Sequence, residues 1–292
     1  MKTLLAALIT PVLVLAACGG NKPSHLVIGS KNFTEQTVLA ELLAQHIESK
    51  LGVLVDRRVN LGGTLICHEA VKSGQIDLYV EYTGTALTAV LHEESTTDPA
   101  EARRRVTEDY GRQFNLEVTE PLGFDNSFAI VIRGDDARRL NLHSLSDIAE
   151  PARQWRAGFG YEFMERPDGF PGLARAYNLK FARDPLLMDL GLLYRALDEK
   201  QVDLVAGNAT DGVIAARGFV VLQDDQRYFP PYEAVPIVNR EALQRFPALR
   251  DALAALAGKI TAEDMRRLNY AVDGEHRDAQ EVVREFLAER KL

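Results

Sequence analysis

The stretch LVIGSKNFTEQTVLAELLAQHIESKLGVLVDRRVNLGGTLICHEAVKSGQIDLYVEY, residues 26–82, decides the fold. In it, short apolar runs alternate with segments whose apolar residues recur at helical spacing. The predicted strands are 26–29, 53–59 and 76–82, and the predicted helices are 34–50, 62–73 and 83–92. Consecutive strand–helix units predict a mainly parallel sheet with helices on both faces, in which ligands bind at the carboxyl ends of the strands.

Outward from this stretch, the same alternation continues toward the C-terminus. The pattern predicts a helix over 98–114, a strand over 128–133, a second α/β set at 144–149, 156–159, 172–177, 190–197 and 202–206, and helices over 240–257 and 261–271. The last helix opens with a capping pattern, Thr261 followed by Asp264. KSGQIDL at 72–78 resembles EKQVDL at 199–204, which favours two lobes of similar construction.

The N-terminus is typical of a lipoprotein signal. A positive start precedes an apolar run that is too short to span a membrane, and the run ends in Leu15-Ala16-Ala17-Cys18. We therefore expect residues 1–17 to be a signal peptide, Cys18 to carry lipid, and 18–24 to be a tether, with ordered structure from His25. The protein is then exported and anchored to a membrane, facing the periplasm or the cell exterior.

Composition excludes several classes of protein. The 292 residues carry a net charge of -8 and show no basic patch, which argues against nucleic acid as a partner. After processing, Cys67 is the one remaining cysteine, so no internal disulfide is expected, and its apolar surroundings predict a buried thiol.

The common catalytic motifs are incomplete or missing in this sequence. His68-Glu69 lacks the second histidine of a metalloprotease helix, Gly158-Phe159-Gly160 lacks the third glycine of a dinucleotide loop, and no Gly-x-Ser-x-Gly elbow occurs. Scattered histidines and one mature cysteine do not indicate a zinc site. We expect no catalytic residue, metal or cofactor, and predict that the protein is not an enzyme.

Five short motifs follow one another along the mature chain: IGSKNFTEQ at 28–36, NLGGT at 60–64, EYTGT at 81–85, RPDGFPGL at 166–173 and FPPY at 229–232. Together they resemble the glycine betaine, choline and osmoprotectant group of ABC-importer substrate-binding proteins. The resemblance covers essentially the whole mature chain, and five motifs in order are more specific than any one of them.

The resemblance implies an α/β, two-lobed type II periplasmic-binding fold, each lobe being a mainly parallel sheet flanked by helices. The chain would cross between the lobes twice. Lobe 1 would comprise 25–126 and 235–292, and lobe 2 would comprise 127–234. The implied function is to capture a small zwitterion, such as glycine betaine, choline or carnitine, and to deliver it to an ABC permease and its ATPase.

A betaine-like ligand requires cationic donors for its carboxylate. Lys31 precedes a helix start, where free backbone amides also favour an anion. Arg166, from the other lobe, offers a planar fork to a carboxylate, and Thr85 offers a hydroxyl. Charged hydrogen bonds of about 1.5–3 kcal/mol each would supply much of the roughly 8 kcal/mol of a micromolar site.

The quaternary ammonium end requires aromatic faces. Tyr82 and Tyr232 match the tyrosines of the family's aromatic box, whereas Phe128 stands where tyrosine is common and Asn208 stands where another tyrosine is expected. Phe128 keeps a π-face. Asn208 has none, and each missing face removes about 0.5–2 kcal/mol of cation–π attraction, while its amide adds a hydrogen-bond donor and acceptor.

Because of Asn208, the ligand stays open between a simple betaine and another amine zwitterion, such as ergothioneine or an amino acid. Two further classes also stay open: an exported lyase or dehydratase on the same fold, and a sensor that presents its ligand to a receptor.

Overall fold

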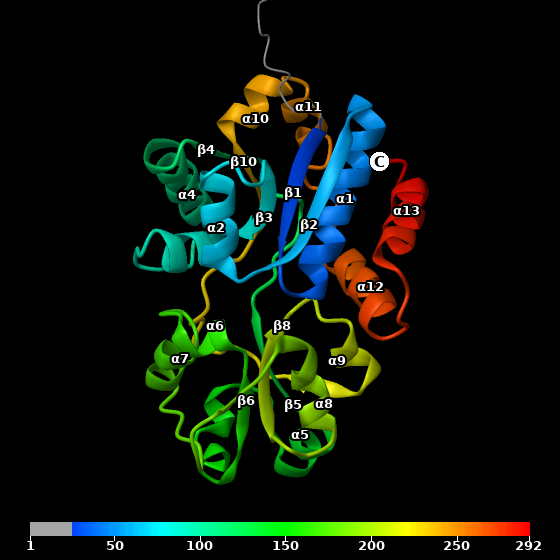
Figure 1. Ribbon diagram of the computed structural model, residues 1–292. Coiled ribbons are helices and arrows are strands. Elements are labelled where there is room, and N and C mark those ends of the chain that lie inside the picture. Colours follow the sequence, from blue (N-terminus) through cyan, green and yellow to red (C-terminus); the bar gives the residue numbers. More distant parts are fainter. Residues whose placement is uncertain (1–24) are drawn as a thin grey trace, which may run out of the picture.

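The computed structural model describes residues 25–292. The predicted signal peptide, Cys18 and the tether lie outside the described residues. Two five-stranded sheets form the frames of two lobes, stacked one above the other in Figure 1; we call the part built on the first sheet lobe 1 and the part built on the second sheet lobe 2. Within residues 25–292, no helix is both long and apolar enough to cross a membrane.

The first sheet has the strand order β2-β1-β3-β10-β4. Its strands are β1 (His25–Lys31), β2 (Leu54–Gly62), β3 (Leu78–Tyr82), β4 (Leu116–Val118) and β10 (Ala234–Asn239). β1 pairs in parallel with β2 and β3, whereas β10 is antiparallel to both of its neighbours. Four strands therefore point the same way and one is reversed.

The second sheet repeats this arrangement with the order β7-β6-β8-β5-β9. Its strands are β5 (Phe128–Arg133), β6 (Ala157–Phe159), β7 (Leu186–Leu187), β8 (Leu204–Asn208) and β9 (Phe219–Val221). Here β5 is the reversed strand. In each sheet the reversed strand is the first one after the chain arrives from the other sheet. The predicted α/β fold with two mainly parallel sheets is confirmed, and the exact lobe boundaries stay a prediction.

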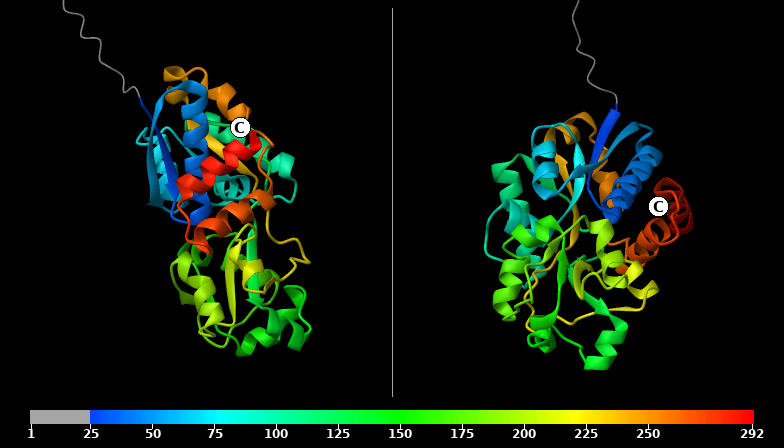
Figure 2. Two further views of the ribbon diagram at one scale, coloured as in Figure 1. Left: turned by 90° about the vertical axis from the view of Figure 1, so that its right-hand side faces the viewer. Right: turned by 60° about the horizontal axis from the view of Figure 1, so that its bottom comes forward.

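Helices cover both sheets, and Figure 2 shows α12 and α13 packed beside α1 in lobe 1 although they come from the C-terminus. The helices of lobe 1 are α1 (Thr34–Leu51), α2 (Thr64–Lys72), α3 (Thr83–Thr85), the π-helix η1 (Ala86–Val90), α4 (Pro99–Gln113), α10 (Arg240–Arg245), α11 (Leu249–Ala254), α12 (Ala262–Asp273) and α13 (Ala279–Arg290). Those of lobe 2 are α5 (Gly134–Leu140), the 3₁₀ turns η2 (Ser146–Ile148), η3 (Pro151–Gln154) and η4 (Leu190–Leu192), α6 (Tyr161–Glu165), α7 (Phe170–Ala176), α8 (Leu193–Asp198) and α9 (Val213–Ala216).

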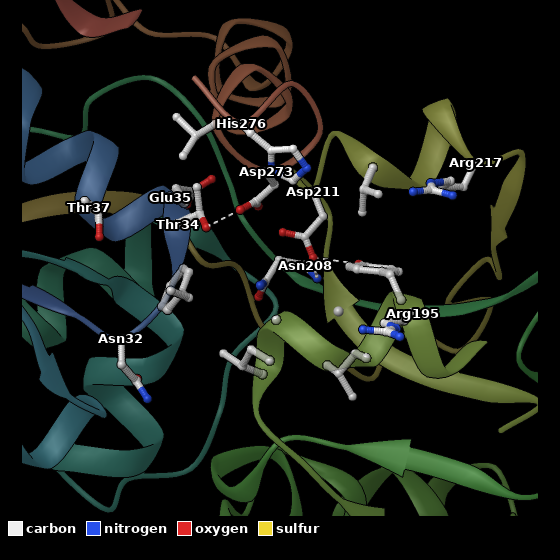
Figure 3. A pocket seen from close by; sticks show the side chains of 18 of the residues that line it. Asn32, Thr34, Glu35, Thr37, Arg195, Asn208, Asp211, Arg217, Asp273 and His276 are labelled. Carbon is white, nitrogen blue, oxygen red and sulfur yellow. Dashed lines mark hydrogen bonds between the residues drawn. The ribbon is translucent and has the colours of Figure 1, made fainter. Parts of the chain in front are cut away.

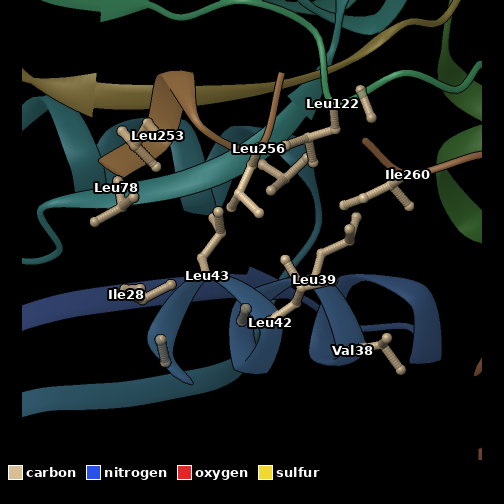
Figure 4. Close-up of a cluster of buried hydrophobic side chains, with 14 of the residues drawn as sticks. Ile28, Val38, Leu39, Leu42, Leu43, Leu78, Leu122, Leu253, Leu256 and Ile260 are labelled. Atoms are coloured by element: carbon tan, nitrogen blue, oxygen red, sulfur yellow. The ribbon is translucent and has the colours of Figure 1, made fainter. Parts of the chain in front are cut away.

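Helix α1 is the centre of the lobe 1 core. Its predicted apolar residues are all fully buried: Val38, Leu39, Leu42, Leu43 and Ile47. They pack between the sheet and side chains from α11 and the following turn (Figure 4). Since burying one such side chain is worth about 1.5–3 kcal/mol, this face fixes the position of α1 and of the loop that leads into it.

One predicted helix is wrong. The segment 240–257 forms two helices, α10 and α11, because Pro247 follows Phe246 and disfavours helical geometry at that residue. The sequence pattern also missed α13. The capping box at Thr261 and Asp264 is confirmed, with the Asp264 amide donating to the Thr261 hydroxyl over 3.1 Å.

The internal resemblance between 72–78 and 199–204 corresponds to one repeated connection. Asp77 accepts from the Val27 amide over 2.8 Å and donates its own amide to the Val27 carbonyl over 2.7 Å. Asp203 does the same with Arg156, over 2.9 Å and 2.7 Å. Each aspartate directly precedes a strand, β3 or β8. It thereby ties the start of that strand to the neighbouring parallel strand of the same sheet, β1 or β6.

We predict that Asp203→Ala lowers the free energy of unfolding by about 1–3 kcal/mol, because the Arg156 backbone amide loses its acceptor and the Arg133 guanidinium loses one of its acceptors. A urea titration measures this. The control is Asp135→Ala, which removes an exposed ion pair with Arg138 and should cost less than about 1 kcal/mol. Equal losses in the two variants would contradict a structural role for Asp203.

Candidate functional site

Five of the predicted ligand residues, Lys31, Tyr82, Phe128, Arg166 and Tyr232, lie where the two lobes face each other. The Lys31 ammonium lies 5.1 Å from the Tyr82 ring centre, and the Arg166 guanidinium lies 5.0 Å from that of Phe128 and 5.9 Å from that of Tyr232. The Phe128 and Tyr232 rings are themselves 5.7 Å apart, edge to face. Cations and π-faces from both lobes therefore share one buried region.

Arg166 is positioned by a carboxylate that the sequence analysis did not select. Its Nε donates to Asp168 Oδ1 over 2.9 Å, its Nη2 donates to Oδ2, and the Tyr232 hydroxyl donates to Oδ2 over 2.7 Å. Burial alone would raise the pKa of Asp168, but the charge of Arg166 outweighs it and holds the pKa below its usual range. The guanidinium is thus an ion-paired group whose Nη1 makes no hydrogen bond within the described chain.

Lys31 is likewise paired. Its buried ammonium donates to Glu81 and, over 3.0 Å, to the Thr64 hydroxyl. Glu81 is fully buried and also accepts from the Tyr79 hydroxyl over 3.2 Å and from the Tyr82 amide over 2.8 Å. The positive charge expected from Lys31 is therefore balanced inside lobe 1.

Glu35, in the first turn of α1, is the most densely hydrogen-bonded carboxylate of the region. It accepts from the Tyr82 hydroxyl over 2.6 Å, the Asn126 amide over 2.7 Å, the Asn269 amide over 3.1 Å and the Thr210 hydroxyl. Burial raises the pKa of Glu35, and the hydrogen bonds from these donors oppose that rise. Since Thr210 belongs to lobe 2, this carboxylate links the two lobes.

A second carboxylate bridges the lobes at the start of α2. Glu162, in α6, accepts from the Thr64 amide over 2.6 Å and lies 3.4 Å from the Thr64 hydroxyl. The approach requires a small residue before the helix, because a Cβ on Gly63 would lie 2.2 Å from the carboxylate. An anion at a helix N-terminus is favourable, so this contact stabilises the approach of the two lobes.

Thr85 ends the short helix α3, which follows β3 directly. Its side chain is buried, and the helix continues as the π-helix η1. No hydrogen bond of its hydroxyl occurs within residues 25–292. The neighbouring Gly84 packs so closely against Tyr232 that a Cβ there would lie 2.9 Å from the ring. Thr85 therefore follows directly after a residue that packs on Tyr232, and its contact with a ligand stays a prediction.

Asn208 lies apart from the buried residues and lines an open cleft of about 670 Å³ between the lobes (Figure 3). The register of β5 and β8 places it directly opposite Phe128. Directly paired residues of neighbouring strands project on the same side of the sheet. Asn208 therefore borders the aromatic region on one side and the cleft on the other.

Sequence reasoning selected the cations and rings but missed four carboxylates: Glu35, Glu81, Glu162 and Asp168. Three of them stand inside the quoted motifs, one to four residues from a selected residue. The acidic residue within each of these motifs was the signal in the sequence that could have indicated a partner for the predicted cations and rings. Cys67, predicted to be a buried thiol, is fully buried, and burial raises its pKa to about 12.

Residues 24–289 match the family model described as the substrate binding domain of the ABC-type glycine betaine transport system. A carnitine transport binding protein of Listeria monocytogenes is 34% identical, over 96% of this chain and 93% of its own. A glycine-betaine-binding protein of Pseudomonas aeruginosa is also 34% identical, over 100% and 96%. A solved structure of a glycine betaine/carnitine/choline ABC transporter is 31% identical, covers 91% of this chain and 98% of its own, and superimposes with a TM-score of 0.76.

We predict a distinctive pH dependence for Glu35→Gln. Because the pKa of Glu35 is raised in the folded state, its ionisation opposes folding. The stability of the wild type relative to this variant should therefore fall as pH rises from about 4.5, the ordinary pKa of a glutamate, and then level off. Urea titrations between about pH 4 and 8 measure this, because shifted carboxyl groups titrate over roughly that range.

Glu117→Gln is the matched control with the opposite sign. A hydrogen bond from Arg250 lowers the pKa of Glu117, so the stability of the wild type relative to this variant should rise with pH over the acid range. If both variants changed in the same direction, the environment assigned to Glu35 would be incorrect.

Proposed function

This chain belongs to the family of substrate-binding domains of ABC-type glycine betaine transport systems, and from that premise we propose that it captures a small betaine-like zwitterion between its lobes and delivers it to a membrane permease. Binding proteins of ABC importers act outside the cytoplasm, bind small ligands, and work with a permease and an ATPase. In this proposal lobe 1 comprises 25–126 and 235–292, and lobe 2 comprises 127–234.

The observation that carries the proposal is the Arg166 guanidinium, held beside two aromatic rings by Asp168. A guanidinium has five N–H donors, and Asp168 uses only two groups, Nε and Nη2. The remaining donors are available to a ligand carboxylate, while Phe128 and Tyr232 offer π-faces to a quaternary ammonium. Asp168 fixes the orientation of the fork before a ligand arrives.

The charge balance supports a zwitterion over a simple anion. Lys31 is paired with Glu81 and Arg166 with Asp168, so each cation has its own counter-ion. A bare anion would meet no excess positive charge in this region. A molecule that carries both charges can instead form hydrogen bonds at one end and cation–π contacts at the other without disturbing that balance.

We further propose that the protein performs no catalysis and uses no cofactor or metal. Asp211, whose pKa burial raises to about 6, is the carboxyl group most similar to a general base. Its hydrogen-bond partners are the Tyr194 hydroxyl and the backbone N–H of Asn208, and neither of them is an activated nucleophile.

The proposal includes a lipid anchor on Cys18 after removal of residues 1–17. We predict that Cys18→Ser leaves the folded protein intact but abolishes incorporation of radiolabelled palmitate and releases the protein from the membrane fraction. Ligand affinity should be unchanged, because the residues of the proposed ligand site run from Lys31 to Tyr232. Membrane retention of the serine variant would rule out this anchor.

We predict that Arg166→Ala weakens the binding of glycine betaine or carnitine by about tenfold or more, because a charged hydrogen bond is lost. Isothermal titration calorimetry measures this, with Arg250→Ala as a control that removes an exposed arginine paired with Glu117. Unchanged affinity would exclude Arg166 from the site.

Removing Arg166 also leaves Asp168 buried without its counter-ion, so a second variant keeps the test clear of folding effects. Phe128→Ala preserves this ion pair and should weaken binding of the same ligands by about 0.5–2 kcal/mol through the lost π-face. Full affinity in the Phe128 variant would show that the ammonium binds elsewhere.

A further inference from the structure

The cleft of about 670 Å³ begins where the aromatic residues end. Phe33, on its wall, stacks on Tyr82 with ring centres 6.5 Å apart. Asn208, also on the wall, lies opposite Phe128 in the sheet register. Two of the proposed box residues, Tyr82 and Phe128, therefore have a direct neighbour on the cleft wall.

The inner wall of the cleft is anionic. Its two arginines are already paired on the lobe 2 side, Arg195 with Glu199 over 2.7 Å and Arg217 with Asp198 over 3.2 Å. The remaining carboxylates of the wall have no salt-bridge partner within residues 25–292; they are Glu35, Asp211 and Asp273. A cationic group that entered here would meet these carboxylates, with His276 as the titratable neighbour of Asp273.

Asp211 accepts hydrogen bonds through only one of its two carboxylate oxygens within the described residues. Both of its donors, the Tyr194 hydroxyl at 2.6 Å and the backbone N–H of Asn208 at 2.8 Å, act on Oδ2, and Oδ1 has no hydrogen bond in the described chain. Figure 3 shows Asp211 beside Asn208; Asp273 lines the same cleft from α12 of lobe 1, where it accepts from the Thr34 hydroxyl over 2.5 Å. Because burial disfavours an ionised carboxylate, this group gains from a cation that comes within reach.

We propose that this protein accommodates an α-betaine with a side chain, that is, an amino acid whose amine is trimethylated, and that the side chain passes Asn208 and places a cationic end against Asp211 and Asp273. This rests on the proposed function. The carboxylate and trimethylammonium occupy the Arg166 and aromatic region, and the cleft selects the side chain. A tyrosine at 208 would fill the path, so the short amide side chain sets the length of ligand that fits.

The test compares three ligands by calorimetry: glycine betaine, lysine betaine and norleucine betaine. The last two share the same four-carbon side chain, to which lysine betaine adds a terminal ammonium. We expect lysine betaine to bind about tenfold more tightly than norleucine betaine, as one charged hydrogen bond provides. Equal affinities for these two would overturn the proposal.

Three variants locate the effect. Asn208→Tyr should weaken lysine betaine binding by about tenfold while glycine betaine binds as well or better, since the tyrosine adds a π-face and blocks the path. Asp211→Asn keeps the shape and should abolish the preference for lysine over norleucine betaine. Glu199→Gln, a wall carboxylate already paired with Arg195, is the control and should preserve that preference.

The outcomes separate the two proposals. If wild-type protein binds glycine betaine but Asn208→Tyr leaves lysine betaine affinity unchanged, the side-chain path is refuted and the betaine-binding function stands. If neither glycine betaine nor lysine betaine binds, the proposed function fails, and this inference fails with it.

Discussion

A buried carboxylate must be supplied with hydrogen-bond donors, and the arrangement of this protein depends on how Glu35 meets that requirement. No salt-bridge partner reaches it within residues 25–292, so neutral donors hold it: Tyr82, Asn126, Thr210 and Asn269. They come from the end of β3, the first crossing between the sheets, the loop after β8, and α12. Leaving such a group unsatisfied would cost several kcal/mol. The relative placement of the two lobes is therefore coupled to one charge at the start of α1.

The same principle governs the cations of the proposed site. Lys31 and Arg166 are buried, and each is stable there because a carboxylate from its own lobe accompanies it, Glu81 and Asp168 respectively. The cost is that neither contributes free positive charge. The benefit is geometric: a paired guanidinium has a fixed plane, so less conformational freedom is lost when a ligand carboxylate binds to its remaining donors. Selectivity for the betaine group then comes from where donors and rings stand.

The repeated sheet topology explains why the site and the cleft adjoin. In both lobes the reversed strand follows a crossing, so the residues at its start, Phe128 in β5 and Ala234 in β10, lie next to the lobe boundary. Cross-strand pairing then brings Asn208 beside Phe128 and Tyr82 beside Ala234. Aromatic faces and the cleft wall consequently meet at the strand ends, the position at which open α/β sheets bind ligands.

The sequence by itself determined the fold class, most strand and helix positions, the buried face of α1, and the aromatic and cationic residues that converge. These are local properties, since hydrophobic periodicity and short motifs specify which face of an element is buried. Even so, Pro247 divides the segment 240–257 into α10 and α11, although the periodicity predicts a single helix. Only the tertiary structure decided the charge partners and the cleft beside Asn208. The partner of a buried charge is chosen by contact between distant segments, as Thr210 is for Glu35, and neither periodicity nor spacing carries that information.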